Sequence, residues 1–448
     1  MTSAPNASNP TFFARTFKFA AAIEPHELKA VTLSFLYMFF LLGSYYILRP
    51  VRDAMGTIYG DGDALEILYT YTFFATFICA PIYGACASRF KLSSFLPWIY
   101  GFFVANILLF YVIFESIPES KSTAGFFFVW VSVFNMFITS VFWSFMSDIF
   151  SRSEAKRLFG FIAAGGSIGA IVGPAITALL VKVVGVNTLL LISAVGFVIV
   201  MFIIRALETE KKKFLARGGD VQKTTLDKNL AGNPFDGFTL LLKSPFLLSI
   251  ALFILLLTWV STILYFQQND LVRAAFSTRE ARTQAFATVD LVVNVGAILV
   301  QLFGTGRIVA RWGITAGLVL VPVVMVLAFV GIAISPIVFV LLGVQVVRRI
   351  SEYAVSRPSR EMLFTAVDQQ SRYKAKNVID TVVYRFGDVS AAWVTAGLTA
   401  MGLSTGGVAV FGVAVAAVWG FFALRLGRAY ESGQYGAPAG RVATAAAE

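Results

Sequence analysis

The stretch Pro245–Phe266 reads PFLLSIALFILLLTWVSTILYF and carries no charged side chain. As an α-helix rising about 1.5 Å per residue, it is about 33 Å long, which matches the roughly 30 Å hydrocarbon core of a bilayer. A run of this length and polarity predicts a helix that crosses a membrane. The number and spacing of similar runs therefore decide the fold.

Eleven further apolar runs accompany this one, and together they predict an all-α integral membrane protein with twelve transmembrane helices. The expected spans are about Ala30–Leu48, Ala64–Ala87, Phe95–Phe114, Ala124–Ile149, Leu158–Val181, Asn187–Ala206, Pro245–Phe266, Ala285–Phe303, Gly313–Ile332, Ile337–Val347, Val378–Met401 and Gly407–Leu426. The tenth run is short, and we expect its helix to continue through Arg348 and Arg349 toward Arg357.

Composition supports a membrane location. Of 448 residues, 58% are hydrophobic and 14% are charged, whereas soluble domains carry about 25% charged residues. The net charge of +11 lies in short loops between apolar runs, so it does not indicate nucleic-acid binding. With one histidine, His26, and two cysteines, Cys79 and Cys86, no metal site, disulfide framework or cofactor is expected.

The distribution of Lys and Arg predicts the orientation. With both termini in the cytoplasm, inside segments hold 28 of the 36 basic residues and outside segments hold 7, while Arg385 lies within a span. The positive-inside rule favours this topology and a location in the cell (inner) membrane. The expected organisation is a cytoplasmic segment (1–29), a six-helix bundle (30–206), a cytoplasmic loop (207–243), a second six-helix bundle (244–426) and a cytoplasmic tail (427–448).

Three short similarities recur at one offset and suggest an internal repeat. Gly84–Lys91 after span 2 is similar to Gly306–Gly313 after span 8, 222 residues later. Ser151–Lys156 is similar to Ser371–Lys376, and Tyr45 with Arg49 and Arg52 to Tyr265 with Arg273, at offsets of about 220. Two parallel six-helix halves around a central cavity are the arrangement of the major facilitator superfamily, which the chain resembles.

Two local motifs add to this resemblance. Gly84, Arg89 and Lys91 are similar to the superfamily's loop between helices 2 and 3, with Ser88 where Asp is usual. Gly169-Ala170-Ile171-Val172-Gly173-Pro174 is similar to its exchanger motif. The alternative for these glycines, and for Gly160, Gly165 and Gly166, is close helix packing.

Further segments resemble the ATP/ADP translocase family of nucleotide exchangers. They are Ile23–Lys29, Leu48–Asp53, Phe142-Trp143, Ser153–Phe159, Arg372–Lys376, Asp380 and Arg385–Gly387. The family's glutamates in helices 4 and 7 are absent: Trp130–Ser132 and Tyr265–Gln267 stand near those places, and Gly387-Asp388-Val389-Ser390 replaces Gly-Lys-Ser-Gly. The resemblance implies an exchanger ancestry and leaves the substrate open.

Polar residues inside the spans are the candidate substrate site, because ionisable groups in a bilayer are costly unless they face a cavity or a partner. Tyr45, Arg49 and Arg52 fall on one face of span 1, and guanidinium groups bind oxyanions well. The alternative is a salt bridge of these arginines to Asp53. Asp290 and Asn294 share a face of span 8, and Asp290 could pair with Arg49 or Arg52 or carry a proton. The remaining candidates are Asn135, Asp380, Tyr384, Arg385 and Asp388, where an internal network around Arg385 is the equal alternative.

A second group of charged residues predicts a cytoplasmic gate. It comprises Arg89, Arg152, Lys156, Arg311, Arg348, Arg349, Glu352, Arg372, Lys374 and Lys376. Enzyme chemistry is not expected, since the chain has no HExxH motif, Cys–His pair or Walker lysine.

These features predict a secondary transporter for a small organic anion, for which the resemblance suggests a nucleotide-like substrate. It would work by alternating access as a monomer in the lipid bilayer, with exchange favoured over proton coupling. The alternative is a transporter-fold protein that no longer transports and acts as a membrane sensor or scaffold.

Overall fold

Helix α8 (Pro245–Ala275) contains the apolar run Pro245–Phe266, and its first turn explains where it begins. The hydroxyl of Ser244 accepts a hydrogen bond from the backbone N–H of Leu247 at 3.3 Å. Pro245 follows in the first turn, where a missing N–H costs nothing. The helix ends at Phe276, whose backbone is extended.

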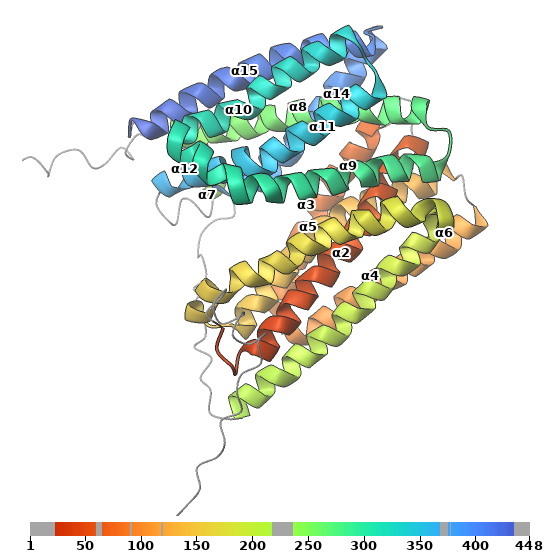
Figure 1. The fold of residues 1–448 in the computed structure, drawn as a ribbon, viewed down its shortest axis with the longest axis vertical. Coiled ribbons are helices and arrows are strands. Elements are labelled where there is room, and N and C mark those ends of the chain that lie inside the picture. The colour runs from red at the N-terminus through yellow and green to blue at the C-terminus, as the bar shows by residue number, and fades with distance from the viewer. Residues whose placement is uncertain are drawn as a thin grey trace, which may run out of the picture. The chain divides into compact units, whose positions relative to one another are not determined.

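The computed structural model describes residues 23–59, 65–89, 92–117, 120–216, 236–367, 375–376 and 378–433. Within these ranges every assigned element is helical (Figure 1), so the all-helical prediction is confirmed there. Arg372, Lys374, most of the predicted central loop, and most of the two predicted terminal segments lie outside the described residues.

The other long elements follow in chain order. They are α2 (Leu28–Tyr59), α3 (Leu65–Arg89), α4 (Leu92–Ser116), α5 (Lys121–Ile149), α6 (Arg152–Ala216), α7 (Asp236–Lys243), α9 (Arg279–Val300), α10 (Gly306–Ile334), α11 (Val338–Ser351), α12 (Arg357–Leu363), α14 (Tyr384–Ala400) and α15 (Thr405–Glu431).

Among the described residues, eight helices are long and apolar enough to cross a membrane. One of them, Arg157–Lys211 in α6, has 55 residues and is about 80 Å long at 1.5 Å per residue, more than twice a bilayer core. Gly185 interrupts it with a φ of 79°, a conformation that glycine adopts readily. The sequence-based count of twelve spans stays a prediction.

Three short π-helical turns interrupt the later helices: η2 (Gln301–Thr305), η3 (Glu352–Ser356) and η5 (Ile379–Val383). A π-helical turn adds a residue and leaves backbone groups without their usual helical partners. Side chains of η2 satisfy two carbonyls of η3: Gln301 donates to Tyr353 O at 3.1 Å and Thr305 to Ala354 O at 2.6 Å. The two irregular turns therefore stabilise each other.

Contacts between residues divide the chain into two units. The first contains residues 1–49, 81–118 and 134–229, and the second contains residues 50–80, 119–133 and 230–448. The chain passes from one unit to the other within α2, α3 and α5. The predicted division into bundles 30–206 and 244–426 stays a prediction.

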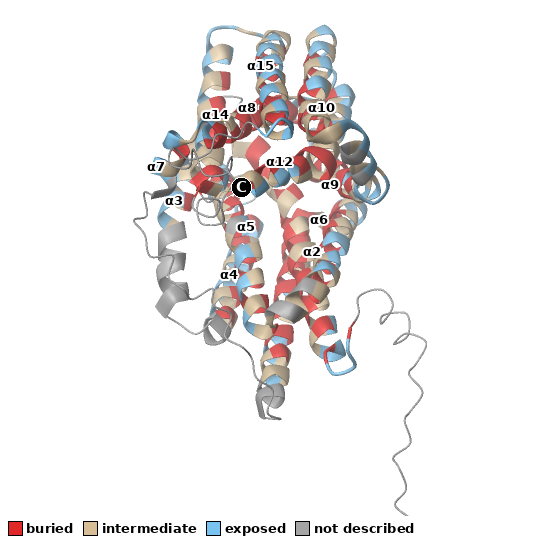
Figure 2. Ribbon diagram, turned by 90° about the vertical axis from the view of Figure 1, so that its left-hand side faces the viewer, coloured by how far each residue is buried: buried red, intermediate tan, exposed pale blue. Residues whose placement is uncertain are grey.

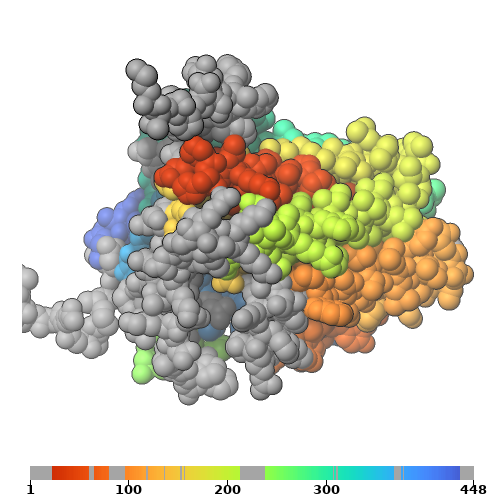
Figure 3. Space-filling model, turned by 90° about the horizontal axis from the view of Figure 1, so that it is seen from below, coloured from red at the N-terminus to blue at the C-terminus, as the bar shows by residue number. Residues whose placement is uncertain are grey.

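Close packing of glycine against backbone characterises the first unit. A Cβ added to Gly165, Gly169 or Gly173 would lie 2.3–2.5 Å from a backbone carbonyl oxygen of α2. The packing interpretation is confirmed for these three glycines, whereas Gly160 has no neighbour within 4 Å. Elsewhere in this unit α4 (orange) lies against the second part of α6 (yellow-green), as Figure 3 shows.

The core of the second unit is built around α8, whose buried residues are red in Figure 2. Helix α8 packs against α14 and α15, and α10 packs along α15. Trp419 of α15 is 1% exposed, and its ring lies 5.4 Å from that of Phe253. This core fixes the helices that carry the candidate site.

Candidate functional site

A small pocket lies inside the second unit and is lined mainly by polar and aromatic side chains. Its lining residues are Arg52 of α2, Tyr69 and Thr72 of α3, Phe128 and Ser132 of α5, and Arg385, Asp388 and Val389 of α14. The cavity volume is about 70 Å³, which accommodates a few water molecules. Organic ligands occupy pockets of about 300–1,000 Å³, so the pocket in this conformation is narrower than an organic substrate.

The guanidinium group of Arg52 is held on two sides. Its Nε and Nη2 donate to Oδ1 of Asp53 at 3.0 and 2.6 Å, and its Nη1 donates to Ser132 Oγ at 3.4 Å. The ring of Phe128 lies 5.2 Å away, within cation–π range. The salt bridge to Asp53 that the sequence left as an alternative is therefore present.

Asp53 also reaches a helix far away in sequence. The hydroxyl of Tyr265, on α8, donates to the same Oδ1 of Asp53 at 2.9 Å. The side chain of Asp53 is only 7% exposed, so this carboxylate is shielded from water. Asp53 thereby joins the pocket arginine on α2 to α8.

Aromatic rings form one wall of the pocket. The ring of Tyr69 lies 6.3 Å from that of Phe128, 6.1 Å from that of Tyr265 and 5.4 Å from that of Phe266. Such ring pairs pack favourably at these distances. A planar apolar group entering the pocket would find aromatic surface next to the guanidinium of Arg52.

Helix α14 supplies a second pair of opposite charges. Asp388 accepts from Thr262 Oγ1 at 3.3 Å and from Arg385 Nη1 at 3.5 Å. Gly387 allows this approach, because a Cβ there would lie 1.9 Å from Thr258 Oγ1 of α8. Arg52 with Asp53 and Arg385 with Asp388 make the formal charge of this site zero.

Asp290 of α9 pairs with a different arginine from the two that were expected. Its Oδ1 accepts from Arg349 Nη1 of α11 at 2.6 Å, and the two side chains are 2% and 8% exposed. The expected partners were Arg49 and Arg52. Helix α11 continues beyond its apolar run and brings Arg349 to α9, whereas Arg52 is held by Asp53.

Arg348, next to that pair, belongs to a polar network that points toward α8. It donates to Glu352 at 2.6 Å, to Ser261 Oγ at 2.8 Å and to Gln345 Oε1 at 2.9 Å. Gln345 in turn donates to Gln268 of α8 at 2.7 Å. Arg348, Arg349 and Glu352, which the sequence suggested as parts of a gate, thus make contacts within the second unit.

Lys376 is the one member of the expected 372–376 gate loop, among Arg372, Lys374 and itself, that the structure describes. It pairs with Glu361, and its Nζ lies 5.5 Å from the ring centroid of Phe364. Burial would raise the pKa of Glu361, but the hydrogen bond and charge of Lys376, with the charges of Arg360 and Arg357, lower that pKa below its usual value. A gate function stays a prediction.

The remaining candidates lie in varied surroundings. In the first unit, Tyr45 packs 6.5 Å from the ring of Phe134, and Arg49 lies 5.6 Å over the ring of Tyr46, while Asn135 is exposed. In the second unit, Asn294 is buried, Tyr384 is half-buried, and Asp380 and Arg311 are exposed. The side chains of Arg89, Arg152 and Lys156 lie outside the described part of the chain.

Sequence reasoning missed several residues of the pocket. Tyr69 and Thr72 are three residues apart and Phe128 and Ser132 are four apart, so each pair lies on one helix face. A hydroxyl-bearing side chain on the same face as an aromatic one was the available signal. Tyr265 was noted only as a place where a family glutamate is absent.

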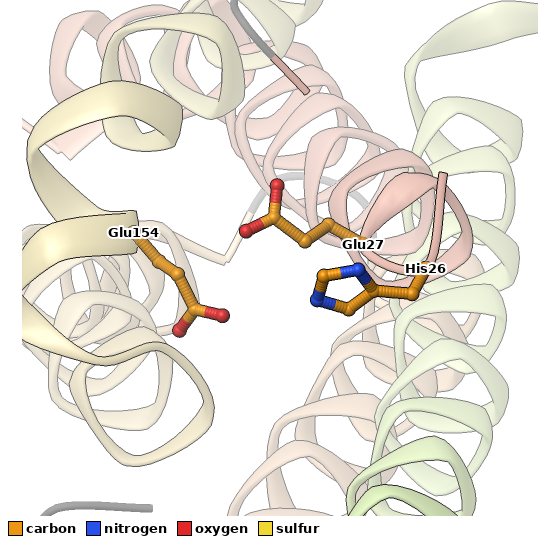
Figure 4. Close-up of side chains that lie close together, drawn as sticks. All are labelled: His26, Glu27 and Glu154. Atoms are coloured by element: carbon orange, nitrogen blue, oxygen red, sulfur yellow. The ribbon is translucent and has the colours of Figure 1, made fainter. Parts of the chain in front are cut away.

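Three potential metal ligands lie together at the start of α2 and of α6, as Figure 4 shows: His26, Glu27 and Glu154. Both carboxylates already have structural partners. Glu27 accepts from Arg157 at 2.7 Å and from the backbone of Glu24 at 2.9 Å, and Glu154 accepts from the backbone of Ser151 at 2.7 Å. These bonds cap helix starts and pair a charge, which favours a structural role for the group.

Comparisons with known proteins add family information to this geometry. Residues 33–356, well over half of the chain, match the family model described as Major Facilitator Superfamily. "ADP,ATP carrier protein 1" of Chlamydia pneumoniae is 22% identical over 453 residues, with 86% of this chain and 87% of that protein covered.

Solved structures show the same fold at low sequence identity. A mutant of the nucleoside transporter NupG is 17% identical with a TM-score of 0.62, covering 91% of this chain and 99% of that one. A bacterial homologue of the iron transporter ferroportin, in an inward-facing state, is 15% identical with a TM-score of 0.63, covering 89% and 99%. The fold is thus shared by proteins with different substrates.

Proposed function

Because this chain belongs to the Major Facilitator Superfamily, we propose that it is a secondary transporter that moves a small organic anion across a membrane by alternating access. The observation that carries the proposal is the pocket where Arg52 and Arg385 meet between predicted spans. Buried guanidinium groups are expensive within a bilayer, and residues that are kept there usually mark a substrate pathway.

A nucleotide-like anion fits this site best. The relatives are named ADP,ATP carriers, and the pocket combines guanidinium groups with the rings of Tyr69 and Phe128. Guanidinium forks bind phosphate oxygens bidentately, and aromatic faces stack on planar rings. Exchange of one anion for another avoids net movement of charge, which costs about 2.3 kcal/mol per charge per 100 mV.

The proposed architecture has twelve spans, with both termini in the cytoplasm. In this topology the ends of α2, α3 and α5 that belong to the second unit face the outside. They pack there against α8, α9 and α14, which supports a substrate-free conformation closed at its outer end. Rearrangement of these contacts would open the pocket to that side.

Transport assays with ADP test this function. Proteoliposomes preloaded with ADP should take up external labelled ADP, and vesicles without internal ADP should not. Uptake that needs no internal ADP but follows an imposed pH gradient would show proton coupling instead. Asp290→Asn then tests whether the buried Asp290 carries the proton. Absence of ADP uptake and of ADP-induced thermal stabilisation would reject this substrate.

The role of Arg52 is tested in the same assay. Arg52→Ala should weaken ADP binding about 10- to 100-fold, because a hydrogen bond to a charged group contributes about 1.5–3 kcal/mol. Arg425→Ala is the matched control, since Arg425 is exposed on α15 outside the pocket lining. If Arg52→Ala binds ADP as the control does, Arg52 is not a substrate ligand.

A further inference from the structure

The carboxylate of Asp53 has two different kinds of partner on one oxygen. Oδ1 receives the Nε and Nη2 donors of Arg52, a pocket residue, and the hydroxyl of Tyr265 on α8. The first contact satisfies the charge of the pocket arginine. The second ties α2 to α8.

Tyr265 lies at the edge of a larger set of contacts, which we call the seam. The seam joins residues 50–80 and 119–133 to α8, α9 and α14 within the second unit. Ala54 packs with Val272 and Phe286, and an apolar cluster contains Leu65, Leu68, Phe128, Phe266 and Ala392.

Polar contacts also cross the seam. Arg282 of α9 donates to Thr57 Oγ1 at 3.2 Å, and Trp393 of α14 donates to Thr70 Oγ1 at 3.0 Å. Asp53 differs from these groups because it touches both the seam and the pocket arginine. It is therefore placed to communicate between them.

The geometry predicts competition at Arg52. The Nε and Nη2 donors lie along one edge of the guanidinium group, and this edge binds carboxylate or phosphate oxygens in the bidentate manner. Asp53 occupies the edge in this structure. An incoming oxyanion that takes the same edge must displace Asp53.

Displacement leaves a buried carboxylate with a much weaker environment. The side chain of Asp53 is 7% exposed, and removing the partner of a buried charge is strongly unfavourable. Hydration would relieve this cost, but water reaches the carboxylate only if the packed seam around it separates.

We propose that Asp53 is a latch that closes the seam while it binds Arg52 and Tyr265, and that a substrate oxyanion bound at Arg52 releases it. The proposal rests on the proposed function, because it assigns the pocket to an anion. Asp53 is thus a positioning residue that couples occupancy of the pocket to opening of the seam.

The first test needs no ligand. A cysteine is introduced by Ala54→Cys, at a seam position with 0% exposure, in a chain carrying Cys79→Ser and Cys86→Ser. The rate of maleimide labelling in detergent then reports opening. Asp53→Asn and, separately, Tyr265→Phe should each raise this rate several-fold, because each weakens the bond between α2 and α8.

Tyr37→Phe is the matched control for loss of a buried tyrosine hydrogen bond. The hydroxyls of Tyr37 and Tyr100 lie 2.7 Å apart in the first unit, away from the seam. This variant should label at the rate of the parent. Equal labelling of the parent, Asp53→Asn and Tyr265→Phe would overturn the latch, as would an equal increase in all three variants.

The second test uses ADP as the probe. In the parent, ADP should raise the labelling rate. In Asp53→Asn it should bind more tightly than in the parent, because the competing carboxylate is gone, and it should add no further labelling. A purely structural role for Asp53 predicts weaker binding, and that result would overturn the proposal.

The two proposals fail in different ways. If ADP does not bind the parent chain, the proposed substrate is wrong, and the labelling without ligand still decides whether Asp53 holds the seam. If ADP binds the parent but Asp53→Asn neither tightens binding nor opens the seam, the transporter proposal stands and the latch is wrong.

Discussion

Asp290 and Arg349 carry opposite charges in positions that water scarcely reaches. Removing two such charges from water costs several kcal/mol for each ion, and their attraction repays this cost only when the geometry is good. The 2.6 Å contact supplies that geometry. The stability of this pair depends on keeping both members.

Arg349→Met should therefore destabilise the protein by about 3–5 kcal/mol, the usual cost of leaving a buried charge without its partner. The double variant Arg349→Met with Asp290→Leu should recover most of that loss, because it buries no charge. Thermal unfolding in detergent measures both. A double variant as unstable as the single one would show that shape, rather than charge, matters at this position.

Single residues also show which parts of the pocket could be predicted. Arg52, Arg385 and Asp388 were candidates because ionisable side chains are rare in apolar runs, and all three line the pocket. Tyr69 and Phe128 were not, because the chain has 44 Phe and 15 Tyr and an aromatic residue in a span usually faces lipid or another helix. Rarity, rather than chemistry, made a residue visible in the sequence.

At the scale of the element, helical irregularity limited what periodicity could predict. Asp380, Tyr384 and Asp388 share a face of a regular helix, and the sequence placed them together. The π-helical turn η5 changes that spacing, and Asp380 is exposed whereas Asp388 is 9% exposed. The existence of the helix was predictable from its apolar run, but its internal register was not.

The contact between α6 and α2 gives an element-scale prediction. Gly169→Ala places a Cβ 2.3 Å from the carbonyl oxygen of Phe39, so the helices must separate. We expect a loss of stability of about 1–3 kcal/mol, as for other overpacked positions. Gly160→Ala, where no atom lies within 4 Å, is the control. Equal melting temperatures for the two variants would contradict this packing argument.

At the scale of the whole molecule, the apolar runs predicted a polytopic helical protein, and the basic residues predicted its orientation. A reporter fused after Lys213 should read as cytoplasmic, and one fused between spans 7 and 8, near Ser277, as external. The physical reason is the 28-to-7 distribution of basic residues. External activity after Lys213 would reverse the proposed topology and the assignment of the seam to the outer side.

The seam also has a consequence for the order in which the protein is made. Thr70 and Trp393 are bonded but separated by 323 residues, and Asp53 and Tyr265 by 212. At a synthesis rate of about 5–20 residues per second, Thr70 leaves the ribosome roughly 15–65 seconds before its partner. Residues 50–80 must therefore wait in the membrane without their final neighbours, and the ribosome sets the earliest time at which the seam can form.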